Sequence, residues 1–593
     1  MGALLLWACA LLLAQLAAAV NEEFVAKLKA ARAVTDESLR KLSDEWQIDK
    51  YPLFLKSCSM HKSSYELMKL KFVDRMVSAA ESKSQKPFVI SFLGSSVAAG
   101  HDSHFNFSYP VVAGEMLAPA FAAMDVIVDA RNMALGNNPC FPYDICVKIF
   151  ANVDADIVHW EQTYNCGGKP ILEQFVRQAM TIPTKPLIVF SESFTAHWAP
   201  DKCITPTGSL TSVESELLAA LHSNATAPTS GGGSGSASVS ASVSGSGVAK
   251  IVSELNKDEF KKAWQNPLGE ISHKYRGAGI QTFTHTSHAP YACQGPYIRE
   301  WEKGAAAWHP SIIAHRLRAA HHAYFWLHAW RDALVDLQAL ASHRPLEDVG
   351  KTTAHKMSVG EFVESHCAAL LHFRILFTAL TSLSLSLSPP PPLLTPVHTP
   401  LPERIHKSPV SEDVKCYSDY EPRGIREASL KAAVVSGLAA EQPRGGWKSI
   451  IYENLVHENL VRSALKAGYK DFKHLLFAEG KDAGPLSVHI KPQKEGAMFV
   501  CETPGIWGAL PEGFEHLWDA KPTFHLTTNV PSANAELQKF VFAADKAKLL
   551  EVEHTKELEI CMQIKGDVPA GDHVLTITPT AASKIILAWI IVP

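Results

Sequence analysis

Short apolar runs alternate with longer, helix-like segments between about residues 87 and 340. The runs have the length and uninterrupted hydrophobicity of strands buried on both faces, and they cover residues 88–93, 126–128, 157–160 and 187–190. Residues 111–124 and 171–180 lie between successive runs and are long enough for crossover helices. This alternation predicts an α/β domain with a doubly wound parallel sheet.

The segment after Pro310 carries apolar residues mostly three and four positions apart. These residues are Ile312, Leu317, Ala320, Phe325, Leu327, Trp330, Leu334 and Leu337. The spacing predicts a long amphipathic helix that begins just after Pro310. The aromatic side chains of Phe325, Trp326 and Trp330 are therefore expected to pack in the core.

After Cys416 the pattern changes to an alternation of apolar and polar residues in steps of two. It is clearest in residues 486–490, 498–501, 558–562 and 574–577, which Gly- and Pro-containing turns separate. The alternation predicts antiparallel strands in an all-β, sandwich-like domain. The last apolar run, residues 585–592, is too short to span a bilayer, so we expect a terminal strand rather than a lipid-anchor signal.

The first twenty residues have the order of features found in a secretory signal. Residues 4–16 are almost wholly apolar, and three alanines at 17–19 precede the polar residue Asn21. This order is typical of a cleaved signal peptide, and an uncleaved anchor is the alternative. No later run of about 18 apolar residues occurs, which excludes a polytopic membrane protein.

Two stretches lack apolar periodicity. Residues 228–247 are rich in Gly and Ser and predict a flexible surface insertion. Residues 350–402 include a Leu-Ser repeat and four prolines at 389–392, which indicate either a linker or a doubtful insertion in the sequence. The expected organisation is a signal peptide (1–19), an N-terminal helical segment (20–84), the α/β domain (85–345), a low-complexity segment (346–410) and the β domain (411–593).

Composition and charge narrow the class of protein. The chain has 593 residues, enough for two or more domains, and its 47% hydrophobic and 20% charged residues exclude a chain that is disordered or collagen-like throughout. It has 56 basic and 60 acidic side chains, a net charge of −4. This balance gives no indication of nucleic acid or another polyanion as a partner.

The cysteines and sequons fit a secreted protein or one in the endomembrane lumen. Of eleven cysteines, Cys9 lies in the predicted signal, and the other ten are expected to pair as disulfides because no short C-x-x-C spacing suggests zinc. Cys501 and Cys561 lie on predicted strands and are candidates for a bridge, with buried free thiols as the alternative. Asn106 and Asn224 begin glycosylation sequons.

Several histidines lie near one another in the second half of the α/β domain. They are His285, His288, His321, His322 and His328. No carboxylate or cysteine recurs beside them at ligand spacing, so we expect structural roles for them. No metal or nucleotide cofactor is expected.

Candidate chemistry lies in the loops that follow the predicted strands. A Gly-Ser-Ser turn after the first strand brings Ser96 to the carboxyl edge of the sheet, where ligand sites lie. Gly136 follows the second strand, Asn165 follows the third, and His309 precedes the long helix. A serine nucleophile needs a base and hydrogen-bond donors for the oxyanion, and residues of these types supply both.

The ordered set Ser96, Gly136, Asn165 and His309 resembles the SGNH (GDSL-like) hydrolase family, and the spacing from Glu161 to Asn165 adds to the resemblance. The resemblance implies a three-layer α/β/α, flavodoxin-like sheet in which Ser96 is the nucleophile and His309 the base. It implies that the Gly136 N–H and the Asn165 amide form the oxyanion hole. The implied activity is that of a secreted esterase for acetyl or other short-chain esters, with an extracellular glycan as substrate and the β domain as a carbohydrate-binding module.

Two positions depart from the family pattern. Ser95 stands where the family usually has Asp before the nucleophile, and Ala306 stands where it has an acid three residues before the histidine. That acid orients the imidazole, so Glu300, Glu302 and Asp201 are candidate substitutes for it. The alternatives are a glycan O-acyltransferase and a catalytically inactive protein of this fold that binds carbohydrate or a cell surface.

Overall fold

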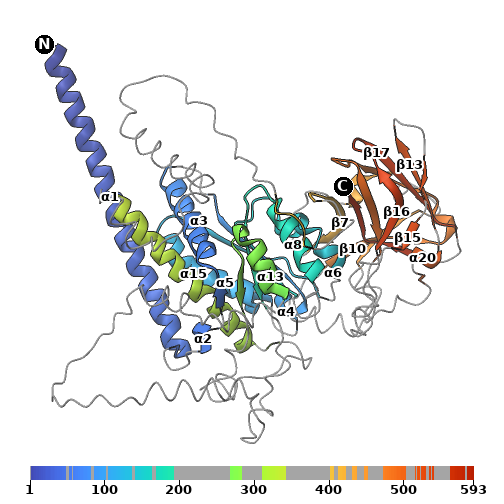
Figure 1. Cartoon of the computed structure of the whole chain (residues 1–593), viewed down its shortest axis with the longest axis horizontal. Coiled ribbons are helices and arrows are strands. Elements are labelled where there is room, and N and C mark those ends of the chain that lie inside the picture. The colour runs from blue at the N-terminus through green and yellow to red at the C-terminus, as the bar shows by residue number, and fades with distance from the viewer. Residues whose placement is uncertain are drawn as a thin grey trace, which may run out of the picture.

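The chain forms an α/β domain and a β-rich domain, which the computed structural model presents side by side (Figure 1). The structure describes residues 2–48, 53–56, 58–81, 86–101, 105–136, 140–162, 169–191, 267–283, 310, 312–341, 401–405, 412–421, 430–436, 438, 446–451, 472–502, 514–515, 517–520, 522–528, 533–535, 537–539, 561–580 and 584–593. The predicted insertion at 228–247 and most of segment 346–410 lie outside these residues.

The N-terminal region is helical except for one short strand. Helix α1 (Gly2–Trp46) runs through the predicted signal peptide, whose cleavage stays a prediction, and α2 (Leu53–Lys56) and α3 (Lys62–Glu81) follow. Strand β1 (Cys58–Met60) lies between α2 and α3 and was not predicted. A three-residue strand is too short to leave a readable periodicity. Among the described residues, no helix is long and apolar enough to cross a membrane.

Five parallel strands with helices on both faces confirm the predicted α/β class. The strands are β2 (Phe88–Gly94), β3 (Val128–Asn132), β4 (Ile157–Glu161), β5 (Leu187–Ser191) and β6 (Gln281–Phe283). They lie in the order β3-β2-β4-β5-β6, and β1 pairs antiparallel with β6 at the edge of the sheet. The chain passes from β2 outward to β3 and then back to β4 on the other side of β2.

The second strand lies further along the chain than predicted. The apolar run at 126–128 predicts a strand there, whereas β3 begins at Val128 and ends at Asn132. Among the described strands β3 pairs with β2 alone, at the edge of the sheet, and its residues are partly exposed and include the polar Asp129 and Arg131. A search for uninterrupted hydrophobicity therefore misses it.

Alternate residues of each strand enter two separate cores. Phe88, Ile90 and Phe92 pack with helices on one face of the sheet, and Val89 and Leu93 pack with helices on the other. The first face is covered by α1, α3, α5 (Tyr109–Ala122) and α15 (Ile312–Ala341). The second is covered by α7 (Val147–Ala151), α8 (Lys169–Met180) and α13 (Pro267–Lys274). Helices α5, α8 and α15 confirm the three predicted helices.

The long helix α15 supplies much of the first core. Phe325, Trp326 and Trp330 are buried, as expected from their helical spacing. The Trp330 ring stacks on Phe121 of α5 with centroids 3.8 Å apart, and Trp326 Nε1 donates to Gln281 of β6 at 3.0 Å. These contacts fix α15 across the sheet and α5.

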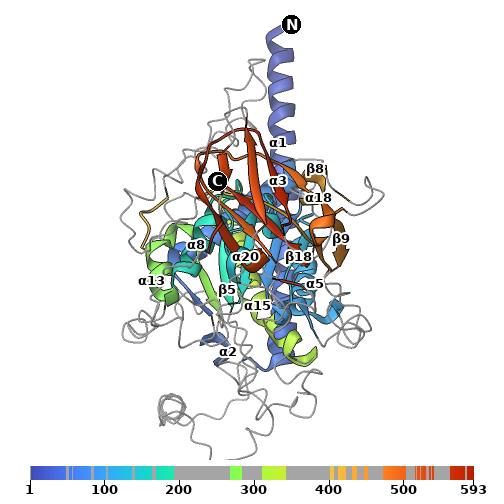
Figure 2. The ribbon, with the colours of Figure 1, turned by 90° about the vertical axis from the view of Figure 1, so that its right-hand side faces the viewer.

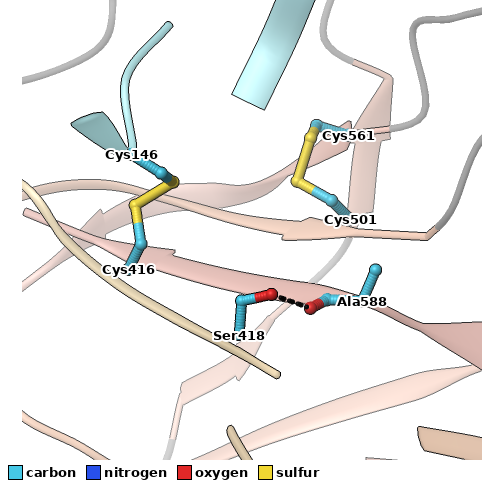
Figure 3. Close-up of a disulfide and its surroundings, with 6 residues drawn as sticks. All are labelled: Cys146, Cys416, Ser418, Cys501, Cys561 and Ala588. Atoms are coloured by element: carbon cyan, nitrogen blue, oxygen red, sulfur yellow. Dashed lines mark hydrogen bonds between the residues drawn. A yellow bond between two sulfur atoms is a disulfide. The ribbon is translucent and has the colours of Figure 1, made fainter. Parts of the chain in front are cut away.

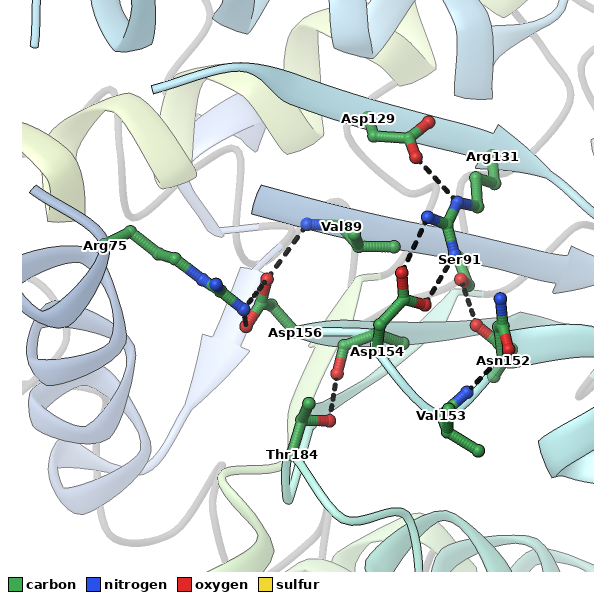
Figure 4. A network of polar contacts seen from close by, with 12 residues as sticks. Arg75, Val89, Ser91, Asp129, Arg131, Asn152, Val153, Asp154, Asp156 and Thr184 are labelled. Carbon is green, nitrogen blue, oxygen red and sulfur yellow. Dashed lines mark hydrogen bonds and ion pairs between the residues drawn. The ribbon is translucent and has the colours of Figure 1, made fainter. Parts of the chain in front are cut away.

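Charged side chains hold the amino-terminal edge of the sheet, opposite the edge that carries Ser96 (Figure 4). Arg75 of α3 donates to both carboxylate oxygens of Asp156, at 2.7 and 2.9 Å, and the Val89 N–H donates to the same carboxylate at 2.9 Å. Arg131 of β3 pairs with Asp154 at 2.7 Å. The starts of β2 and β4 are therefore fixed relative to α3.

The second domain consists of two antiparallel sheets that share a buried core. One sheet has the order β15-β16-β12-β19-β7-β10-β18, with β9 beside β10, and contains β7 (Lys415–Glu421), β9 (Lys448–Ile451), β10 (Phe472–Glu479), β12 (Gly496–Cys501), β15 (Leu537–Lys539), β16 (Cys561–Val568), β18 (Lys584–Leu587) and β19 (Trp589–Val592). The other has the order β14-β13-β17-β11-β8, with β8 (Val434–Ser436), β11 (Leu486–Ile490), β13 (Thr523–Thr528), β14 (Ala533–Ala535) and β17 (His573–Thr578). Figure 2 views these strands in front of the α/β domain.

The antiparallel arrangement confirms the predicted all-β character, with one correction. Of the strand predicted at 558–562, residues 561 and 562 begin β16, and residues 558–560 lie outside the described residues. The final apolar run is two strands rather than one, because the strand is interrupted at Ala588, whose N–H donates to Cys501 O at 2.9 Å. Strand β18 then pairs with β10, whereas β19 pairs with β7 and β12. No Gly or Pro marks this break in the sequence.

Disulfides join the two domains and two strands within the second (Figure 3). Cys146, just before α7, is bonded to Cys416 of β7, and Cys501 of β12 is bonded to Cys561 of β16, as predicted. Cys140 is also disulfide-bonded. Pairing of all ten cysteines was wrong, since Cys58 is a buried free thiol. Its neighbour β6 carries no cysteine and instead offers Gln281 Nε2, 3.0 Å from the Cys58 sulfur.

Candidate functional site

Ser96 lies at the carboxyl edge of the parallel sheet, where β2 turns directly into the short helix α4 (Ser96–Ala99). Ser95 caps this helix, and its Oγ accepts a hydrogen bond from the Val97 N–H at 3.2 Å. Gly100 ends the helix with φ +88°, and a Cβ there would lie 2.8 Å from the Cβ of Ser108. The sharp strand-to-helix turn expected around Ser96 is therefore present.

The loop that carries Gly136 runs beside this turn. The Met133 N–H donates to Phe92 O at 2.9 Å, and the Leu135 N–H donates to Gly94 O at 3.1 Å, so the segment after β3 continues along β2. Gly136 follows Leu135 and is buried. The structure thus brings Ser96 and Gly136 to the same edge of the sheet, and the role of the Gly136 N–H stays a prediction.

This edge coincides with the point where the order of the strands reverses. From β2 the chain goes to β3 on one side, and it then returns to β4 on the other. In open α/β sheets, ligands bind in the crevice that forms at such a switch point, outside the carboxyl ends of the strands. Ser96 follows β2 and Gln162 follows β4, so the two loops flank the switch point.

Asn165 and His309 lie outside the described residues, as do Asp201, Glu300, Glu302 and Ala306. The described residues next to His309 enter the domain near Ser96. Pro310 is buried, and in the first turn of α15 the Nδ1 of His315 accepts a hydrogen bond from the Tyr109 N–H at 3.3 Å. Tyr109 begins α5, beside Ser108, which contacts the end of α4. The roles predicted for Asn165 and His309 stay predictions.

Glu161 is a buried carboxylate at this edge, and the sequence pattern did not predict a role for it. It is the last residue of β4 and lies opposite Gly94 of β2 in the register of the two strands. Its Oε2 accepts hydrogen bonds from the Ser95 N–H at 3.1 Å, the Ser95 Oγ at 3.0 Å and the Ala98 N–H at 3.2 Å. An acidic residue at the carboxyl end of a fully buried strand is the signal that would have identified it.

Burial and a nearby cation shift the pKa of this carboxyl in opposite directions. Burial raises the pKa of Glu161 to about 7, while the Arg318 guanidinium and the hydrogen bonds from Ser95 and Ala98 lower it. Arg318 of α15 is itself fully buried, which lowers its pKa, and its guanidinium carbon lies 6.0 Å from the centroid of the Tyr109 ring. The site therefore contains a carboxyl group and a guanidinium cation that are both buried away from water.

The histidines of α15 pack in the core. The His321 ring lies 4.1 Å from that of Phe54, and His322 Nδ1 lies 2.8 Å from Arg318 O. Burial lowers the pKa of His322 and of His328 to about 4. Within the described part of the chain, no group of three or more His, Cys, Asp or Glu residues is arranged to hold a metal ion. His285 and His288 lie outside that part.

The first sequon lies near the candidate site. Asn106 is exposed on the single turn Phe105–Phe107, which lies between α4 and α5. An exposed side chain is what attachment of a glycan requires. Asn224 lies outside the described residues, and glycosylation at either position stays a prediction.

No family model and no curated protein matches the sequence. Among solved structures, the chain is similar to a two-domain esterase active on acetylated mannans, with 12% identity, a TM-score of 0.35 and coverage of 88% of this chain and 95% of that one. A crystal structure of such an esterase with mannopentaose matches with 10% identity, a TM-score of 0.35 and coverage of 88% and 93%. At this TM-score the likeness carries no argument about the reaction or the substrate of this chain.

Proposed function

We propose that the chain is a secreted serine esterase of the SGNH type, with a flavodoxin-like α/β domain, that hydrolyses acetyl or other short acyl esters on extracellular glycans. The observation that carries the proposal is the position of Ser96, in a sharp turn at the carboxyl end of β2 and beside the topological switch point of the sheet. The loop of Gly136, hydrogen-bonded along β2, lies at the same edge and supports the role proposed for its N–H.

In the proposed reaction, His309 takes the proton of Ser96 Oγ as the oxygen attacks the ester carbonyl. The Gly136 N–H and the Asn165 amide stabilise the tetrahedral oxyanion. His309 then returns the proton to the departing alcohol, which leaves an acyl-enzyme on Ser96. His309 next deprotonates a water molecule, whose oxygen attacks the acyl carbonyl, and it returns this proton to Ser96 Oγ as the carboxylic acid leaves. Glu300, Glu302 and Asp201 are the candidate partners for the second imidazole nitrogen.

The proposed compartment and the proposed substrate have different support. The disulfides Cys146–Cys416 and Cys501–Cys561 fit a protein of the extracellular space or the endomembrane lumen. The glycan substrate and the carbohydrate-binding role of the β domain rest on the family resemblance alone. Ala306, in the position of the usual acid, favours a second candidate function, a binding protein that has lost catalysis.

Residues 20–593, expressed behind a secretion signal, should hydrolyse p-nitrophenyl acetate or acetylated xylan. Ser96→Ala should reduce turnover to the uncatalysed background because it removes the nucleophile. Ser38→Ala, on α1, is the matched control and should retain wild-type turnover. Equal turnover of the wild type and a folded Ser96→Ala variant would refute the esterase and direct the search to glycan binding by the β domain.

A further inference from the structure

We infer that Glu161 is a positioning residue that holds the β2–α4 turn, defined here as residues 94–98, and so fixes Ser96 for attack. The inference rests on the proposed function for its kinetic consequence. Its structural part, that the carboxylate holds the turn, is supported by the hydrogen bonds of Glu161 Oε2.

One carboxylate oxygen holds the turn on both sides of Ser96. Glu161 Oε2 accepts from the N–H and the Oγ of Ser95, which precedes Ser96, and from the N–H of Ala98, which follows it. Ser95 and Ala98 are buried, at 3% and 0% exposure. Without this acceptor their donors would be buried and unsatisfied, a state that proteins avoid, so the turn would have to shift.

The turn is closed tightly around the carboxylate. A Cβ at Gly94 would lie 2.8 Å from Glu161 Oε2, and 2.9 Å from both Glu161 Cβ and Ala98 Cβ. Gly94 and Glu161 are also partners in the pairing of β2 with β4. The absence of a side chain at Gly94 is therefore what allows the carboxylate to approach the turn.

The serine at position 95 explains why the Glu161 carboxylate can approach the turn. The SGNH pattern has Asp at this position, and a carboxylate at residue 95 would face that of Glu161 across about the length of one hydrogen bond. Serine instead donates a hydrogen bond to the carboxylate. In this chain the acidic group of the turn thus comes from the neighbouring strand.

The charged and titratable groups around Glu161 come from three other elements and from β4 itself. They are Arg318, His315 and His322 of α15, Tyr109 of α5, Tyr143 of α6 (Cys140–Tyr143) and, on β4 itself, His159. Arg318 is the group whose charge favours the ionised carboxylate. Because α15 begins just after Pro310, the helix that follows His309 also supplies this cation.

The test compares three variants with a matched control. Glu161→Leu removes the acceptor, and Glu161→Gln keeps an acceptor oxygen without the charge. Ser95→Ala removes one donor together with the Oγ that caps the Val97 N–H. The control is Glu173→Leu, since Glu173 of α8 is a buried carboxylate that likewise accepts from a hydroxyl, Tyr275, and a backbone N–H, Ile405. Two quantities are measured: amide hydrogen exchange in the peptide covering 94–101, and kcat and KM for p-nitrophenyl acetate.

Glu161→Leu should speed exchange in this peptide and lower kcat by about 100-fold with KM unchanged, since misplacement of a reacting group acts on the chemical step. Glu161→Gln should restore most of both, Ser95→Ala should give a smaller loss, and Glu173→Leu should leave both at the wild-type level. If Glu161→Leu does not fold, the Glu161→Gln and Ser95→Ala variants test the inference through the same two measurements, amide exchange and kcat.

The outcomes separate this inference from the esterase proposal. If Ser96→Ala abolishes turnover while Glu161→Leu keeps wild-type exchange or wild-type kcat, the positioning role is overturned and the esterase stands. If Ser96→Ala keeps wild-type turnover, the esterase fails. The exchange measurement then still decides whether Glu161 holds the turn, and unchanged exchange overturns that too.

Discussion

The buried carboxyl of Glu161 is expected to make the stability of the α/β domain depend on pH. Burial raises its pKa from 4.5 to about 7 in the folded protein. Between these two values the folded state keeps a proton that the unfolded state has released. The resulting contribution to stability is fully present below about pH 4.5 and is lost as the pH rises through about 7. The hydrogen bonds persist on protonation, because Oε2 takes all three donors and Oε1 accepts none from the described residues.

The magnitude follows from the two pKa values. Each pKa unit is worth about 1.4 kcal/mol, so the difference between 4.5 and about 7 corresponds to a loss of about 3 kcal/mol in unfolding free energy. Glu161→Gln carries a neutral amide of the same shape and has no such dependence. The free energy of unfolding of the wild type should therefore fall by about 3 kcal/mol relative to that of the variant between about pH 4.5 and 8.

Urea unfolding of both proteins across this pH range tests the prediction. Tryptophan fluorescence reports on the relevant domain, because Trp160, Trp326 and Trp330 are buried in it. Only the difference between the two proteins is compared, so other titrating groups cancel. A difference that stays constant to within about 0.5 kcal/mol would refute the raised pKa and the argument from burial behind it.

Two further predictions concern the cysteines. Replacing Cys146 and Cys416 with serine should lower the unfolding free energy by about 2–4 kcal/mol and increase proteolytic cleavage between the domains. Replacing Cys501 and Cys561, which lie within one sheet, should not increase that cleavage. Equal cleavage of the two variants would contradict the role of the Cys146–Cys416 disulfide in linking the domains. Burial raises the pKa of the Cys58 thiol to about 12, so iodoacetamide at about pH 8 should label it only after unfolding, and mass spectrometry that finds native labelling would contradict this.

Predictions from the sequence succeed where a segment is buried on both faces or on one regular stripe. Strands β2, β4 and β5 are buried along their whole length, so their hydrophobicity is uninterrupted. Helix α15 is identified by its spacing of apolar residues. The edge strand β3 and the short strand β1 fail this criterion, because partial exposure or short length removes the pattern on which it depends.

The residues of the candidate site likewise differ in whether the sequence alone could identify them. Ser96 and Gly136 are identified from local features, a small-residue turn and a glycine after a strand, and the structure brings their loops together. Glu161 has no local feature that ties it to Ser95, because the two are 66 residues apart in the sequence and meet only through the pairing of β2 with β4. Contacts across strands depend on register, which sequence periodicity alone does not give.

The two departures from the SGNH pattern therefore have different consequences. At Ser95 the missing carboxylate is matched by one from β4, which contacts the Ser95 hydroxyl and the Ala98 N–H, so the turn around Ser96 keeps an acidic group. At Ala306 the missing acid concerns the orientation proposed for His309, which is a separate role from the hydrogen bonds that Glu161 Oε2 accepts from the turn. If Glu161→Leu lost kcat while Ser95→Ala kept most of it, the acidic group that holds the turn would be Glu161 of the adjacent strand and not the residue before the nucleophile.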